Sequence, residues 1–231
     1  MNTYKCWAAV LIAVLLLPSV AASADAAKQA YEKGKACFDK LDYDAAIAAF
    51  TEAIRLDPKN AESYCRRGWT YTRKSDLAKA LADCNEAIRL NPALVLAHSV
   101  RGWIYGAMGN QEKAITDCTE AIRLNPKYSK AYNNRGLAFR RKGEYKKAIA
   151  DYSESIRLDP KDGIAYCGRG AVYENKGELD KAIADYTESI RLDPKYANAY
   201  YHRGIAFRHE GEQAKAEEDF AQAKKLGYKP P

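Results

Sequence analysis

The sequence repeats with a period of 34 residues, and this periodicity limits the possible folds more than any other feature of the chain. Three residue types recur in the same phase, each five or six times, which excludes coincidence. They are Pro58, Pro92, Pro126, Pro160 and Pro194; Gly34, Gly68, Gly102, Gly136, Gly170 and Gly204; and Ala46, Ala80, Ala114, Ala148, Ala182 and Ala216. A period of this length indicates one supersecondary unit stacked on copies of itself.

Each copy predicts two helices. In the fourth copy, residues 130–142 and 144–158 both place apolar and aromatic side chains at three- and four-residue steps, the spacing of an amphipathic helix. Gly143 separates the two segments. Pro160 ends the second one, because a residue that precedes proline is pushed out of the helical region. The sequence therefore predicts an all-α fold of helical hairpins.

The repeated residues resemble the tetratricopeptide repeat (TPR) family. The small residue at place eight and the alanine at place twenty occur in all six copies, and an aromatic residue stands at place eleven in every copy but the first, which has Cys37. The large residue of place twenty-four is replaced by Cys84 and Cys118 in the second and third copies. The resemblance implies a right-handed superhelical solenoid of six 34-residue helix-turn-helix repeats: 27–60, 61–94, 95–128, 129–162, 163–196 and 197–230.

The last copy departs from the others in its charge. Isoleucine or leucine occupies places twenty-one and twenty-eight in the first five copies, but the sixth has Glu217 and Lys224 there. Terminal repeats of a solenoid need a polar outer face for solubility. We therefore expect the sixth repeat to cap the array and the chain to be complete at this end.

Residues 1–24 have the pattern of a secretory signal peptide. Lys5 precedes an apolar run from Ala8 to Leu17, and small residues lead to Ala24. The run is shorter than the roughly 18 residues that a membrane-spanning helix needs. We expect cleavage after Ala24, a periplasmic or secreted mature chain that begins at Asp25, and no stable membrane span after cleavage.

Composition and motifs argue against several functional classes. The net charge of +7 is spread along the chain without a basic block, so nucleic acid is not an expected partner. The sequence has no glycine-rich phosphate loop, paired-histidine zinc motif, serine elbow or CxxC motif. His202 and His209 lie seven residues apart on one helix face, but zinc needs three or four ligands. We expect no enzyme activity, no cofactor and no metal.

The arginine–aspartate positions and the cysteines are both expected to serve the fold. Arginine at place seven and aspartate at place twenty-three are both present in repeats 2 to 6 and both absent from repeat 1, which indicates an ion pair within each repeat; an arginine ladder for anionic ligands is the alternative. The five mature cysteines, Cys37, Cys65, Cys84, Cys118 and Cys167, are expected to be small packing or groove residues without intrachain disulfides.

The resemblance also implies a binding surface. First helices of TPR proteins line a concave groove, chiefly through places two, five, six, nine, twelve and thirteen, although place nine could instead pack against the adjacent repeat. The candidate groove residues are Trp69, Arg73, Leu96, Val100, Trp103, Lys130, Asn133, Asn134, Leu137, Arg140, Arg141, Tyr201, His202, Ile205, Arg208 and His209.

Only Lys130 and Asn134 match parts of the two-carboxylate clamp of chaperone-binding members. We expect a non-catalytic adaptor that holds an extended peptide or protein segment, with its apolar part near the tryptophans and its acidic part over repeats 4 to 6. A carrier for an envelope polysaccharide or lipid-derived component is the alternative, in which the tryptophans and basic residues supply stacking and anion contacts.

Overall fold

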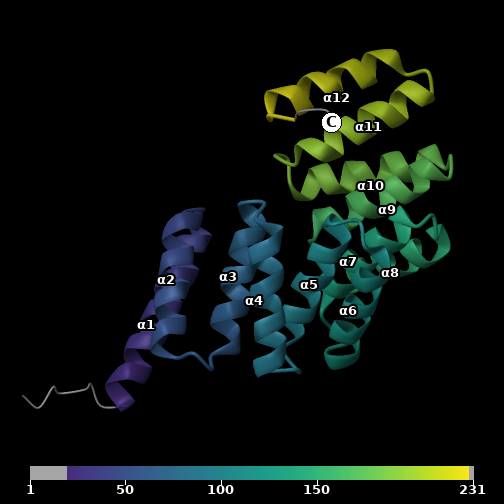
Figure 1. Cartoon of the computed structure of the whole chain (residues 1–231). Helices are drawn as coiled ribbons and strands as arrows, with labels where there is room; N and C mark the ends of the chain where they lie inside the picture. The colour runs from purple at the N-terminus through teal and green to yellow at the C-terminus, as the bar shows by residue number, and fades with distance from the viewer. Residues whose placement is uncertain (1–19, 229–231) are drawn as a thin grey trace, which may run out of the picture.

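A computed structural model describes residues 20–228, which form twelve helices and no strand (Figure 1). Consecutive helices pair into six hairpins, one for each predicted repeat, so the predicted all-α solenoid is confirmed. The helices are α1 (Val20–Asp39), α2 (Tyr43–Leu56), α3 (Ala61–Arg73), α4 (Leu77–Leu90), α5 (Val95–Ala107), α6 (Gln111–Leu124), α7 (Ser129–Arg141), α8 (Tyr145–Leu158), α9 (Gly163–Asn175), α10 (Leu179–Leu192), α11 (Ala197–His209) and α12 (Gln213–Lys225).

Place fifteen makes the turn between the two helices of each repeat. The last four repeats have glycine there with φ between 74° and 84°, a backbone conformation that costs glycine little: Gly109, Gly143, Gly177 and Gly211. Leu41 and Ser75 adopt the same conformation in the first two repeats, with φ of 63° and 60°. Non-glycine residues are uncommon in this region, so these two turns are strained relative to the others.

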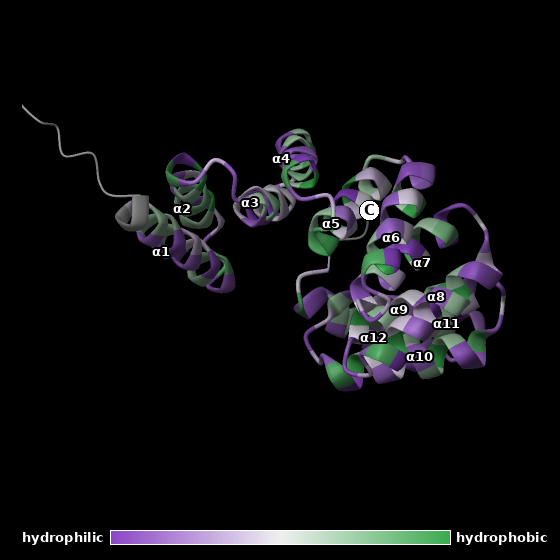
Figure 2. Ribbon diagram, turned by 90° about the horizontal axis from the view of Figure 1, so that it is seen from below, coloured by the Kyte–Doolittle hydropathy of each residue, from purple (hydrophilic) through white to green (hydrophobic). Residues whose placement is uncertain are grey.

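The predicted close approach of paired helices is also present. Glycine at place eight faces the large residue at place twenty-four of the second helix. At Gly34, for example, an added Cβ would lie 2.6 Å from the Phe50 ring, too close for any other residue. In repeats 1, 4, 5 and 6 the missing side chain admits one aromatic ring, whereas in repeats 2 and 3 it faces Cys84 and Cys118. The helices in Figure 2 carry hydrophilic as well as hydrophobic residues.

Contacts between helices define the inner side of the solenoid. Each first helix touches the first helix of the next repeat, from α1–α3 through to α9–α11, whereas second helices of successive repeats make no such contact within residues 20–228. Helices that approach one another more closely lie on the inside of a curve. We use "inner surface" for places two, five, six, nine, twelve and thirteen of the first helices.

The first and last described helices relate to the predicted signal peptide and to the predicted terminal repeat. Residues 1–19, with most of the predicted signal peptide, lie outside the described residues, and α1 runs across the predicted cleavage position after Ala24. None of the described helices has both the length and the apolar character that crossing a bilayer requires. On α12, Glu217 and Lys224 are exposed, as expected for the outer face of a terminal repeat.

Candidate functional site

The arginines of place seven form the predicted pairs. In each of repeats 2 to 6 the guanidinium donates two hydrogen bonds of 2.7–2.9 Å to the aspartate of place twenty-three. The hypothesis of an intra-repeat pair is confirmed. The pairs are Arg67–Asp83, Arg101–Asp117, Arg135–Asp151, Arg169–Asp185 and Arg203–Asp219.

A third bond joins each of these arginines to the preceding repeat. Nη1 of Arg135 donates to Thr119 Oγ1 at 3.1 Å, and the other four make the same bond to place twenty-five of the repeat before. This contact was not predicted from the sequence, because it depends on how closely successive repeats approach. Three side-chain hydrogen bonds therefore hold each of these five arginines within the fold.

Five other arginines have no carboxylate partner, and all five lie on the inner surface. The chain has fifteen arginines: five pair with aspartate as above, and five on second helices pair with a glutamate three residues earlier. Within residues 20–228, no carboxylate lies within 4 Å of the remaining five, at places six, twelve or thirteen. They are Arg66, Arg73, Arg140, Arg141 and Arg208. Arg66 was not among the predicted residues, although its place six is an inner one.

The two predicted tryptophans differ in exposure. Trp69 is half-buried: its ring centroid lies 4.9 Å from that of Phe38, 5.5 Å from the Arg66 guanidinium and 5.6 Å from Lys130 Nζ. Trp103 is 37% exposed and is one of few large apolar side chains of the described chain to be so. Stacked cations and aromatic rings attract one another by about 0.5–1 kcal/mol at exposed sites.

Two predicted apolar groove residues belong mainly to the core. Val100 is only 7% exposed and packs with Cys84 and Ile104, while Leu96 packs against the same cluster from its edge. The large apolar side chains accessible on the inner surface of repeats 2 and 3 are therefore Trp103 and, in part, Trp69 and Leu96.

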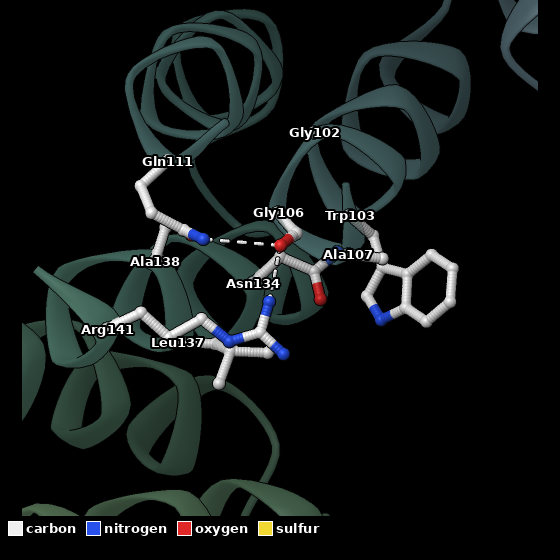
Figure 3. Close-up of a pocket in the computed structure, with 9 residues that line it drawn as sticks. All are labelled: Gly102, Trp103, Gly106, Ala107, Gln111, Asn134, Leu137, Ala138 and Arg141. Atoms are coloured by element: carbon white, nitrogen blue, oxygen red, sulfur yellow. Dashed lines mark hydrogen bonds between the residues drawn. The ribbon is translucent and has the colours of Figure 1, made fainter. Parts of the chain in front are cut away.

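A small cavity opens beside Trp103 (Figure 3). It measures about 40 Å³ and lies where α5, the start of α6 and α7 meet. We call it the Trp103 notch; it is lined by Gly102, Trp103, Gly106, Ala107, Gln111, Asn134, Leu137, Ala138 and Arg141.

The polar side chains of the notch converge on one carbonyl. Figure 3 shows that the Gln111 amide and the Arg141 guanidinium both donate to the oxygen of Gly106, Gln111 at 3.2 Å. This oxygen also accepts from the Gly109 amide at 3.2 Å, and it belongs to the C-terminal turn of α5, where a cation is favourable. Arg141 therefore ties α7 to α5 and keeps its remaining donors at the mouth of the notch.

The side-chain amides of Asn133 and Asn134 already donate hydrogen bonds to other residues of the chain. Asn134 Nδ2 donates to the carbonyl and the hydroxyl of Ser99, both at 3.2 Å, and Asn133 Nδ2 lies 3.4 Å from Asp162 Oδ2. An asparagine can pair with a peptide backbone through both its donor and its acceptor. Here the Asn134 donor is used between repeats, so only its acceptor oxygen is left for a ligand.

The inner surface of repeats 5 and 6 carries a contact between acid, phenol and imidazole. Tyr186 donates to Glu174 Oε2 at 2.6 Å, and His202 Nδ1 lies 3.5 Å from the same oxygen with its ring stacked on Tyr186. Burial of Glu174 would raise its pKa, but His202 and the Tyr186 hydroxyl hold that pKa below its ordinary value. His202 is therefore part of the packing between repeats 5 and 6.

The other predicted residues of repeat 6 lie around this contact. Tyr201 stacks on Tyr228 with ring centroids 4.2 Å apart, and Ile205 is half-buried. Arg208 and His209 are exposed near the end of α11. Among the described residues, no group of three or more histidine, cysteine or acidic side chains could hold a metal ion.

The described cysteines are unbridged, and all but Cys37 are buried. Burial raises the pKa of Cys65, Cys118 and Cys167 to about 12, so these thiols stay protonated near neutral pH. They act as small packing residues.

Comparison with known families agrees with the geometry. Profiles described as "Tetratricopeptide repeat" match residues 31–94, 95–128 and 118–150, and a profile described as "TPR repeat" matches 136–177 and 175–211. Together these matches run without a gap from residue 31 to 211. The chain belongs to the tetratricopeptide repeat family.

Solved structures of this family resemble the chain. MamA is 27% identical, with a TM-score of 0.57 over 69% of this chain and 93% of MamA. PilW, described as a widely conserved type IV pilus biogenesis factor, is 19% identical, with a TM-score of 0.75 over 86% of this chain and 92% of its own. YrrB, described as a TPR protein with an unusual peptide-binding site, is 23% identical, with a TM-score of 0.54 over 78% and 92%.

Proposed function

We propose that this TPR protein is a non-catalytic scaffold that binds an extended, acidic peptide or protein segment along its inner surface. One observation carries the proposal: the arginines without a carboxylate partner all lie on that surface, which also carries the exposed Trp103. A guanidinium without a counter-charge is a strong donor for carboxylates. Arginine and tryptophan are also the residue types most enriched among those that dominate binding energy at interfaces.

Size and chemistry favour a chain-like partner over a small molecule. The Trp103 notch of about 40 Å³ is far smaller than the roughly 300 Å³ or more of a typical small-molecule site. The uncompensated arginines extend from repeat 2 to repeat 6, so an occupant must be long to reach them all. YrrB, a TPR protein with a peptide-binding site, is an example of the same fold holding a peptide.

The compartment is part of the proposal. The residues before Asp25 have the charge and apolar pattern of a secretory signal peptide, and we propose that the mature chain works in the periplasm or outside the cell. The partner should then be sought among exported proteins.

The test begins with capture and ends with matched variants. The mature chain, starting at Asp25, is used to capture partners from the exported compartment for mass spectrometry, and the binding of the purified partner is then measured. Trp103→Ala should weaken binding by about 2 kcal/mol. Leu41→Ala, which truncates a 70% exposed side chain on a turn, is the control and should have no effect.

A charge-matched pair of variants tests the arginines. Arg140→Ala removes an unpaired inner charge, and Arg157→Ala removes one from the outer helix of the same repeat, where it is paired with Glu154. Arg140→Ala should slow association and reduce its salt dependence, whereas Arg157→Ala should not. Equal binding by wild type, Trp103→Ala and Arg140→Ala would show that the partner uses another face. Capture of a polysaccharide or lipid in place of a protein would contradict the peptide proposal.

A further inference from the structure

Gly106 is a glycine that neither its backbone nor its packing requires. It lies in the last turn of α5 and does not adopt a positive φ, so alanine could take the same conformation. Glycine within a helix destabilises it relative to alanine, because it has more conformational freedom to lose. Place twelve has a larger side chain in every other repeat: Phe38, Thr72, Arg140, Glu174 and Arg208.

The surroundings of Gly106 leave room for a methyl group. An added Cβ would lie 3.7 Å from Ala114 Cβ and from Gln111 Oε1, and 3.8 Å from Arg141 Nη1, which are ordinary contact distances. Gly102, one turn earlier, differs: its Cβ would lie 2.6 Å from Cys118 Sγ, so packing alone explains that glycine. What the missing side chain of Gly106 does is leave the Trp103 notch open.

The notch offers apolar contacts to an occupant. Trp103 and Leu137 supply apolar surface, and the volume of about 40 Å³ exceeds the roughly 10–15 Å³ that admits one water molecule. Gln111 Oε1 is buried beside it and is not within reach of an occupant.

We propose that the Trp103 notch seats one small apolar side chain, of alanine to valine size, from the segment that the inner surface binds. This inference rests on the proposed function and specifies the ligand. The positive charges around the notch favour acidic residues on either side of this small residue in the bound segment. Arg66 and Lys130 lie over the Trp69 ring and Arg141 lines the notch, so the small residue should be flanked by aspartate or glutamate.

The test uses a displayed library of random dodecapeptides, selected on the intact mature chain. The selected peptides should have acidic residues around one alanine, serine or valine. Replacement of that residue by glycine or by leucine should each weaken binding, because glycine leaves the notch empty and leucine exceeds it.

Gly106→Ala separates binding from folding, because the two should change in opposite directions. The variant should melt higher by about 1–4 °C, through helix propensity, but bind the selected peptide about tenfold more weakly, since its methyl group occupies the notch. Thr116→Ala is the matched control. It also adds a better helix former, on the outer helix α6, and should raise the melting temperature without changing affinity.

The outcomes separate this inference from the proposed function. If Trp103→Ala loses the peptide while Gly106→Ala binds it like wild type, the notch is not the seat, although the groove still binds. Selection of peptides that lack a small residue in an acidic context also overturns the inference. If no peptide is selected, or if the selected peptides bind Trp103→Ala and Arg140→Ala like wild type, the proposed function fails and the inference fails with it.

Discussion

The pair of Arg135 and Asp151 should contribute more to stability than any surface ion pair of the same repeat. The Arg135 side chain is 19% exposed and that of Asp151 is 9% exposed, and two hydrogen bonds of 2.8 Å join them. Removal of one member leaves the other charge largely buried without its partner. Such losses cost about 3–5 kcal/mol for fully buried pairs, and the partial exposure of Arg135 places Asp151→Ala near 3 kcal/mol.

A double-mutant cycle isolates the pair from its surroundings. Arg135→Met keeps an apolar side chain of similar length, while it removes the bonds to Asp151 and Thr119 and the contacts of the guanidinium with the Tyr132 and Phe139 rings. The loss of the Thr119 bond occurs in both Arg135 variants and cancels in the cycle. The coupling that remains is that of a bidentate, charge-assisted pair, which we expect at about 2 kcal/mol.

The assay is unfolding in urea, because guanidinium chloride would screen the charges. The cycle of Arg157→Met with Glu154→Ala, an exposed pair three residues apart on α8, is the control and should show little coupling. If the Arg135–Asp151 coupling were as small as the control, the pair would not be a structural element, and the arginines of place seven would again be candidates for ligand binding.

Three further predictions concern other parts of the chain. Asp117 holds the pKa of His98 above its ordinary value, so the stability that the charged His98 contributes is complete below about pH 6.5 and is lost as the pH rises through the folded-state pKa. Unfolding in urea across this range should show that slope in wild type but not in His98→Tyr; equal slopes would contradict it. Gly168→Ala should lower stability by about 1–3 kcal/mol, because its Cβ would lie 2.4 Å from the Tyr152 ring; an unchanged melting temperature would disprove the clash. N-terminal sequencing of the native protein should begin at Asp25, and an uncleaved chain in the cytosol would remove the export proposal.

The sequence predicted the structural features whose residues recur in several repeats. Six copies of glycine at place eight and of alanine at place twenty indicated that the helices pair closely. The joint presence of arginine and aspartate indicated the five ion pairs. The sequence could not predict features that depend on the distance between successive repeats. Bonds such as Arg135 to Thr119 and Asn134 to Ser99 join one repeat to the next, and the burial of Val100 depends on how closely α3 and α5 approach.

His98 shows how a departure from the repeat can be interpreted only with both the pattern and the structure. Tyrosine at the same place donates to a proline carbonyl in repeats 4 and 6, through Tyr132 and Tyr200. His98 Nε2 lies 2.9 Å from the corresponding carbonyl of Pro92. A carbonyl only accepts, so Nε2 must donate. The Nδ1 atom then faces Asp117 Oδ1 at 3.8 Å, which favours a second proton.

The fifteen arginines of the chain fall into two groups, one that pairs with carboxylates and one that does not. Ten arginines occur at two fixed places, recur from repeat to repeat and are neutralised within their own repeat. The five others occur at places that vary from repeat to repeat, lie on the inner surface and have no carboxylate partner in the described chain. Positive charges without a neighbouring carboxylate favour an anionic partner. Since the repeated residues are occupied by the fold, the proposed function assigns ligand specificity to the residues that differ between repeats, of which Arg66, Trp103, Gly106 and Arg140 are the ones to change first.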